Sequence, residues 1–103
     1  MKDLRKAQVI VGQIDSKYRT NLNPVKWSTV YSSEAEIVED LKKIRIPEKG
    51  EPMAVCRLYA GYEYIHSFAR WVQNGKPLTE KQMRQCKRLA LEIKKAVAIA
   101  DCY

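Results

Sequence analysis

Two long runs of apolar residues at helical spacing, joined by a short turn-forming stretch, restrict the fold of this chain more than any other feature. From Val55 to Val72, apolar residues recur every three or four positions, which is the pattern of one helix face. A second such run extends from Met83 to Ala100. The stretch between them contains the letters NGKPLT (residues 74–79). The pattern therefore predicts two long antiparallel helices that meet at a tight corner.

The corner carries both a helix stop signal and a helix start signal. Gly75 suits the left-handed residue that closes a helix. Thr79 suits the N-cap of the next helix, and Gln82, three residues on, completes a capping box. Pro77 removes a backbone donor where a phosphate-binding loop needs several. We therefore interpret the stretch as a structural corner, and not as a phosphate loop.

A further helix is predicted between Ser33 and Pro47. Ser33 suits its N-cap, with Glu36 at the capping-box position. Acidic residues come first and basic residues last, which suits the helix dipole. The connection before it contains VKWSTVY (residues 25–31), which we interpret as a short extended piece.

The N-terminal segment, residues 4–19, admits two interpretations. Apolar residues from Leu4 to Tyr18 repeat at heptad-like spacing, which indicates a helix. The letters VIVGQI within it are rich in β-branched residues around a glycine, which favours a strand. The spacing holds over more residues than a strand needs, so we favour the helix. The predicted fold is all-α: a small four-helix domain with a C-terminal antiparallel helical hairpin.

The chain of 103 residues is expected to form a single domain, residues 1–103. Residues 1–50 would hold the N-terminal helices and connection, and residues 51–103 the hairpin. Hydrophobic residues make up 46% of the chain and charged residues 30%, which is typical of a folded globular protein. No secretory signal or membrane-length apolar stretch is visible, and we expect a cytoplasmic protein with no membrane partner.

The net charge of +7 is concentrated toward the C-terminus. Between Lys76 and Lys95 there are seven basic residues and two acidic ones. A positive surface favours polyanions, such as nucleic acid or an acidic protein partner, and it argues against a mimic of DNA. Lysine-rich helix faces also occur simply as solvent-exposed faces, so the charge alone does not decide between these interpretations.

The residues that carry chemistry favour a binding protein over an enzyme. The chain has one histidine, His66, which excludes a histidine-rich metal site. The cysteines Cys56, Cys86 and Cys102 lack metal-ligand spacing and are expected to be reduced thiols. Phosphate-loop and dinucleotide-binding motifs are absent from the sequence. We therefore expect no enzymatic activity and no cofactor.

Two side-chain groups on the first hairpin helix are candidates for partner binding. Tyr59, His66 and Arg70 share a stripe with Glu63 beside the apolar face, where they would either grip a partner or pack at the rim of the core. Tyr64 and Trp71 lie nearly opposite the apolar stripe. They would either be covered by other helices or form an interface, including one between copies of the chain.

The far side of the last helix is the candidate nucleic-acid surface. On one continuous helix, the basic residues Lys81, Arg84, Arg88 and Lys95 fall together, away from the apolar face. They would contact phosphates while Tyr or Trp side chains stack on bases. Because standard recognition motifs are absent, we expect phosphate contact without sequence readout.

The segment from Phe68 to Glu92 resembles short helical segments in small accessory proteins of phages and mobile elements. The matching residues are Phe68, Trp71, Gly75, Leu78, Thr79, Glu80, Lys81 and Gln82. The resemblance covers about a quarter of the chain and concerns a structural corner, so it names no family. It implies a small protein that binds host or viral machinery, often on nucleic acid.

Three hypotheses follow from the sequence. The leading one is a non-enzymatic accessory protein of phage type that binds nucleic acid, or the acidic surface of a host protein that handles nucleic acid, as host-takeover or anti-defence inhibitors do. The second is a protein–protein module that uses Tyr64, Trp71 and the N-terminal helix, with homo-oligomerisation as one form. The third is a nucleotide-binding sponge in which Tyr59 stacks on a base.

Overall fold

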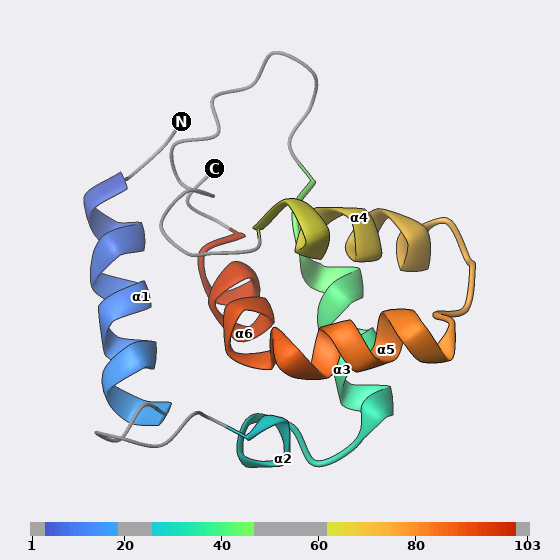
Figure 1. Cartoon of the computed structure of the whole chain (residues 1–103). Helices are drawn as coiled ribbons and strands as arrows, with labels where there is room; N and C mark the ends of the chain where they lie inside the picture. Colours follow the sequence, from blue (N-terminus) through green and yellow to red (C-terminus); the bar gives the residue numbers. More distant parts are fainter. Residues whose placement is uncertain (1–3, 19–25, 47–61, 101–103) are drawn as a thin grey trace.

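The chain folds as a set of packed helices around one shared core (Figure 1). The computed structural model describes residues 4–18, 26–46 and 62–100, and within them no strand occurs. The helices there are α1 (Leu4–Tyr18), α2 (Trp27–Val30), α3 (Glu34–Lys43), α4 (Tyr62–Gln73), α5 (Glu80–Arg88) and α6 (Ala90–Ala98). The all-α prediction is confirmed. The predicted beginning of the hairpin near Pro52 lies outside the described residues.

The N-terminal segment is a helix, so the favoured interpretation is confirmed and the strand alternative is wrong. Ala7 and Val11 are buried, which is the outcome that the heptad-like spacing predicts. α1 packs mainly against α6. An ion pair joins the two helices: Lys95 Nζ lies 2.6 Å from the Asp15 carboxylate, and the lysine side chain is buried, at 5% exposed.

The sequence predicts a short extended piece at VKWSTVY, and this is wrong for its central residues, because Trp27–Val30 form the single helical turn α2 between the extended residues Lys26 and Tyr31. Val25 lies outside the described residues. Backbone bonds close the turn, from Thr29 N–H to the Lys26 carbonyl at 3.0 Å and from Tyr31 N–H to the Trp27 carbonyl at 2.9 Å. Val30 and Tyr31 are buried, and α2 packs against α6. Its tertiary packing outweighs the β-propensity of these residues.

α3 is bounded by side-chain caps at both ends. The Ser33 hydroxyl accepts a hydrogen bond from Glu36 N–H at 3.3 Å, as predicted. The Glu36 carboxylate accepts from Ser32 N–H, one residue earlier than a regular capping box requires. At the other end, the Gln73 amide on α4 donates to the Leu41 and Ile44 carbonyls at 3.1 and 2.8 Å. This contact ties the end of α4 to the end of α3.

The corner between α4 and α5 has the predicted stop and start signals. Gly75 has a φ of 81°. Its N–H bonds to the Val72 carbonyl, and Lys76 N–H bonds to the Trp71 carbonyl, so the helix end is a Schellman motif. Thr79 and its partner three residues on form a complete capping box at the start of α5. The corner thus turns the chain back, and α4 and α5 run antiparallel (Figure 1).

The predicted last helix is broken at Leu89, which corrects the expectation of one continuous helix. Leu89 has φ −102° and ψ 19°, and α6 departs from the line of α5 after it (Figure 1). α5 is amphipathic and lies at the surface, whereas α6 is covered by α1, α2 and α3. Ile93 and Ala96 are fully buried. The change of direction lets α6 enter the core while α5 keeps its charged face outside.

None of the helices within residues 4–18, 26–46 and 62–100 is both long enough and apolar enough to cross a membrane.

Replacing Thr79 by Ala should lower the free energy of unfolding by about 1 kcal/mol, because the substitution removes the acceptor for the backbone N–H of Gln82. Denaturant unfolding measures this change. Thr79→Ser keeps the hydroxyl and should stay close to the parent protein. A Thr79→Ala variant as stable as the parent protein would contradict the role given to this cap.

Replacing Asp15 by Asn should lower the free energy of unfolding by about 1–3 kcal/mol, because it leaves the buried Lys95 ammonium without its counter-charge. The lower part of that range is expected, since Asp15 is 38% exposed. Lys95→Met removes the buried charge and keeps the stem, so it should cost less than Asp15→Asn. If the two variants lose equal stability in denaturant unfolding, the buried charge does not govern the contact between α1 and α6.

Candidate nucleic-acid interface

The corner places one face of α4 beside one face of α5, and a groove lies between them. Its volume is about 380 Å³. α4 contributes two aromatic side chains, and α5 contributes two amides and two cations. The lining residues are Tyr64, Phe68, Lys81, Gln82, Gln85 and Arg88. We call this the α4–α5 groove.

The aromatic side of the groove pairs one exposed ring with one buried ring. Tyr64 is 65% exposed, whereas Phe68 is 9% exposed. Ile65, Ala69 and Val72 turn toward the core and are buried. Tyr64 is therefore held on a well-packed helix with its ring open to solvent, which is the placement that a stacking platform requires.

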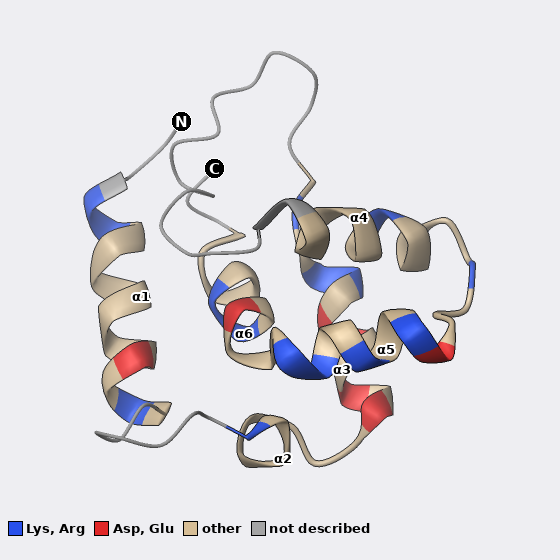
Figure 2. Cartoon of the chain, viewed as in Figure 1, with Lys and Arg blue, Asp and Glu red and all other residues tan. Residues whose placement is uncertain are grey.

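The basic side of the groove is the outer face of α5. Lys81, Arg84 and Arg88 are all exposed, and Figure 2 shows basic residues along the length of this helix. Lys81 and Arg88 line the groove itself. Arg84 forms an ion pair with Glu80 at 3.8 Å, but both side chains are largely exposed, so solvent weakens the pair. All three cations are accessible to an anionic partner.

The corner also fixes the orientation of an amide in the groove. The side-chain oxygen of Gln82, Oε1, accepts a hydrogen bond from the backbone N–H of Thr79 at 2.9 Å. Its amide nitrogen is left as a donor beside Lys81 and Arg88. These three groups all donate hydrogen bonds, so this side of the groove suits acceptor atoms such as phosphate or base carbonyl oxygens.

Lys95 was predicted to belong to the same basic face, but it lies on α6 and not on α5. The break at Leu89 ends the continuous helix on which that prediction depended. Lys95 is 4% exposed and pairs with Asp15, so it holds α1 in place. The structure therefore brings Lys81, Arg84 and Arg88 together on α5 and separates Lys95 from them.

The predicted stripe of Tyr59, His66 and Arg70 does not form one described surface. Tyr59 lies outside the described residues. His66 is 6% exposed, and Arg70, one turn later, is exposed. Burial lowers the pKa of His66, and the neighbouring Arg70 guanidinium lowers it further. The described part of the stripe therefore contains a buried imidazole, whose protonation is disfavoured, and a cation at the surface.

Trp71, predicted to form an interface with Tyr64, is part of the corner. Its indole N–H donates to the Pro77 carbonyl at 2.8 Å. The Lys76 ammonium lies 4.5 Å from the centre of its ring, a cation–π contact. These contacts stabilise the path of the loop between the helices. Of the two aromatic residues, Tyr64 is the one whose ring is exposed.

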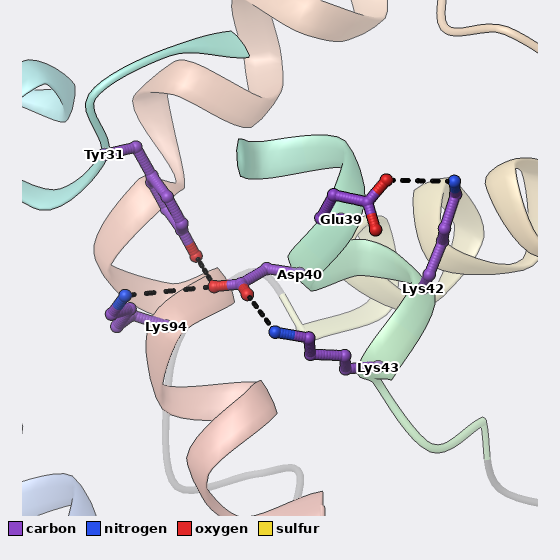
Figure 3. Close-up of polar contacts among 6 residues, drawn as sticks. All are labelled: Tyr31, Glu39, Asp40, Lys42, Lys43 and Lys94. Atoms are coloured by element: carbon purple, nitrogen blue, oxygen red, sulfur yellow. Dashed lines mark hydrogen bonds and ion pairs between the residues drawn. The ribbon is translucent and has the colours of Figure 1, made fainter. Parts of the chain in front are cut away.

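A polar cluster around the buried side chains of Tyr31 and Asp40 was not predicted from the sequence (Figure 3). The Tyr31 hydroxyl donates to Asp40 at 2.7 Å, and Lys43 and Lys94 lie 3.6 and 4.0 Å from the same carboxylate. Burial raises the pKa of Tyr31, and the hydrogen bond to Asp40 raises it further. The acid at position 40 had been explained by the helix dipole alone. Nothing in the local pattern indicates its partners on α6 and before α3.

No protein-family model, curated protein or solved structure matches this chain. Within the described ranges 4–18, 26–46 and 62–100, no group of three or more His, Cys, Asp or Glu side chains is placed to hold a metal ion. The function must therefore be argued from the site itself.

The lowered pKa of His66 predicts a loss of stability in mild acid. Below the usual histidine pKa of about 6.5, the unfolded chain binds a proton that the folded chain resists. The free energy of unfolding should therefore fall as the pH drops below about 6.5. His66 is the one histidine in the sequence, so urea unfolding of His66→Gln should show a smaller fall. An identical fall in both proteins would contradict the assignment.

Proposed function

We propose that this protein binds single-stranded nucleic acid through the α4–α5 groove, as a non-enzymatic accessory protein of the phage type. The observation that carries the proposal is the exposed ring of Tyr64 in a groove that also holds Lys81 and Arg88. An aromatic platform beside basic side chains is the arrangement that binds single strands without sequence readout. In this arrangement a base stacks on Tyr64 while the two cations contact phosphates.

The groove favours a single strand over a duplex for a geometric reason. Only an unpaired base offers its flat face to an aromatic side chain such as Tyr64. Helical proteins that read duplex DNA instead place a recognition helix in the major groove, where it contacts the edges of the bases. In this protein α4 forms the wall of the groove opposite α5, and the Tyr64 ring on α4 lines the groove together with the cations of α5. The expected ligand is therefore a strand that lies along the groove between the two helices.

The chemistry of the groove supports binding and not turnover. The described side chains that line it are aromatic, amide and cationic, and none of them is a carboxylate, histidine or cysteine. The biological setting, a host-takeover or anti-defence protein in the host cytoplasm, rests on the resemblance of the Phe68–Glu92 corner to phage accessory proteins. An acidic surface of a host protein that handles nucleic acid presents a similar charge, and the test below separates it from direct binding.

Tyr64→Ala should weaken binding to a fluorescent single-stranded oligonucleotide by about 5- to 150-fold, because stacking contributes about 1–3 kcal/mol per base. Fluorescence anisotropy with single-stranded DNA and RNA measures this directly. Denaturant unfolding of the same variant serves as the control. Because Tyr64 is exposed, the free energy of unfolding should change little.

Replacing both Lys81 and Arg88 by Gln should reduce the salt dependence of binding. Loss of two phosphate contacts should lower the slope of log K against log salt by about 1.4. The matched control replaces Lys26 and Lys42, exposed residues away from the groove, with the same change of charge. Equal affinity and slope in the two double variants would overturn the proposal. So would a parent protein that binds an acidic protein but no oligonucleotide at low salt.

A further inference from the structure

A second groove lies between the end of α1, the last turn of α3 and the outer side of α6. Its volume is about 330 Å³, at the lower end of the range for small-molecule sites. It shares no residue with the α4–α5 groove. Each of the three helices contributes one lysine: Lys17 from α1, Lys43 from α3 and Lys94 from α6. We call it the three-lysine groove.

The electrostatics of the three-lysine groove favour an anion. Among the described residues that line it, Asp40 is the one acidic residue. Its carboxylate already accepts a hydrogen bond from Tyr31 and lies near Lys43 and Lys94 (Figure 3). Because the two lysine contacts, at 3.6 and 4.0 Å, are longer than charge-assisted hydrogen bonds, these ammonium groups keep donors for a ligand. One carboxylate against three ammonium groups leaves an excess of two positive charges.

The rest of the lining is apolar. Ile14 from α1 and Val97 from α6 contribute aliphatic side chains, and Tyr18 contributes its ring. The Lys17 ammonium lies 5.3 Å from the centre of that ring, so Lys17 is held beside the apolar surface. The groove therefore combines cationic groups with an apolar surface, and a matching ligand needs both an anionic group and an apolar group.

We propose that the three-lysine groove binds an amphiphilic anion, with a carboxylate or phosphate head on an aliphatic body. The head contacts Lys17, Lys43 and Lys94, and the body covers Ile14 and Val97. A nucleotide is a poorer match, because its base and ribose need hydrogen-bond partners. Tyr18 has the one uncharged polar side chain among the described lining residues, and the oxygens of Asp40 are engaged.

The probes that test the apolar part are hexanoate, octanoate and octanol, measured by isothermal titration calorimetry. Each additional methylene that is buried should strengthen binding about fourfold, so octanoate should bind more tightly than hexanoate by up to about 15-fold. Octanol, without charge, should bind more weakly than octanoate. Octyl phosphate distinguishes the two heads: whichever of octanoate and octyl phosphate binds more tightly identifies the preferred anion.

The variant that tests the charged part is Lys17→Gln, because it leaves the contacts of Asp40 intact. It should weaken octanoate binding about three- to tenfold without lowering the melting temperature. Lys42→Gln is the matched control, since Lys42 is exposed on α3 and does not line the groove. Its octanoate affinity should equal that of the parent protein.

Three results would overturn the proposal. The first is the absence of saturable binding by both octanoate and octyl phosphate. The second is an equal affinity for hexanoate and octanoate, or an affinity for adenosine monophosphate equal to that for octanoate. A simple cluster of lysines would give either result. The third is equal weakening by Lys17→Gln and Lys42→Gln. None of these results bears on oligonucleotide binding in the α4–α5 groove, so the two proposals fail independently.

Discussion

The rest of the candidate site depends on the corner between α4 and α5. Gly75 closes one helix in the left-handed conformation, and Thr79 caps the next. Between them, the Trp71 indole N–H holds the Pro77 carbonyl. These local bonds reverse the chain within a few residues and hold the two helices side by side. The groove with Tyr64 on one wall and Lys81 on the other exists because of that reversal.

The structure divides the basic residues of the C-terminal half between two roles. On α5 the cations face solvent and remain available to a partner. On α6, Lys95 is buried against Asp15 and joins α1 to the core. Sequence spacing cannot distinguish the two cases, because both kinds of lysine lie in the same helical pattern. The break at Leu89 separates them, since α6 turns into the core after it.

The local elements could be predicted from the sequence, and the long-range contacts could not. The caps at Ser33 and Thr79, the positive φ of Gly75 and the buried stripe of α4 follow from residue types at fixed spacing. The short helix α2 packs on α6, and α6 packs against α1 and α3 after the break at Leu89; no local pattern in the sequence indicates these contacts.

In the candidate site, too, the local features could be predicted and the contacts between helices could not. Lys81, Arg84 and Arg88 were predicted as a surface group, and the exposed Tyr64 as a possible interface residue. The sequence did not indicate that Tyr64 shares a groove with Lys81 and Arg88, because that depends on the register between two helices. It also gave no sign that Asp40 would meet Tyr31, which precedes α3, and Lys94, which lies on α6.

The most direct test of the central claim is to locate bound nucleic acid on the protein by nuclear magnetic resonance. Titration of ¹⁵N-labelled protein with a short single-stranded oligonucleotide reports the amides whose surroundings change. The account predicts that the largest shifts fall on α4 around Tyr64 and on α5 from Lys81 to Arg88, with little change on α1 and α3. Shifts concentrated on other helices, or none at low salt, would contradict it.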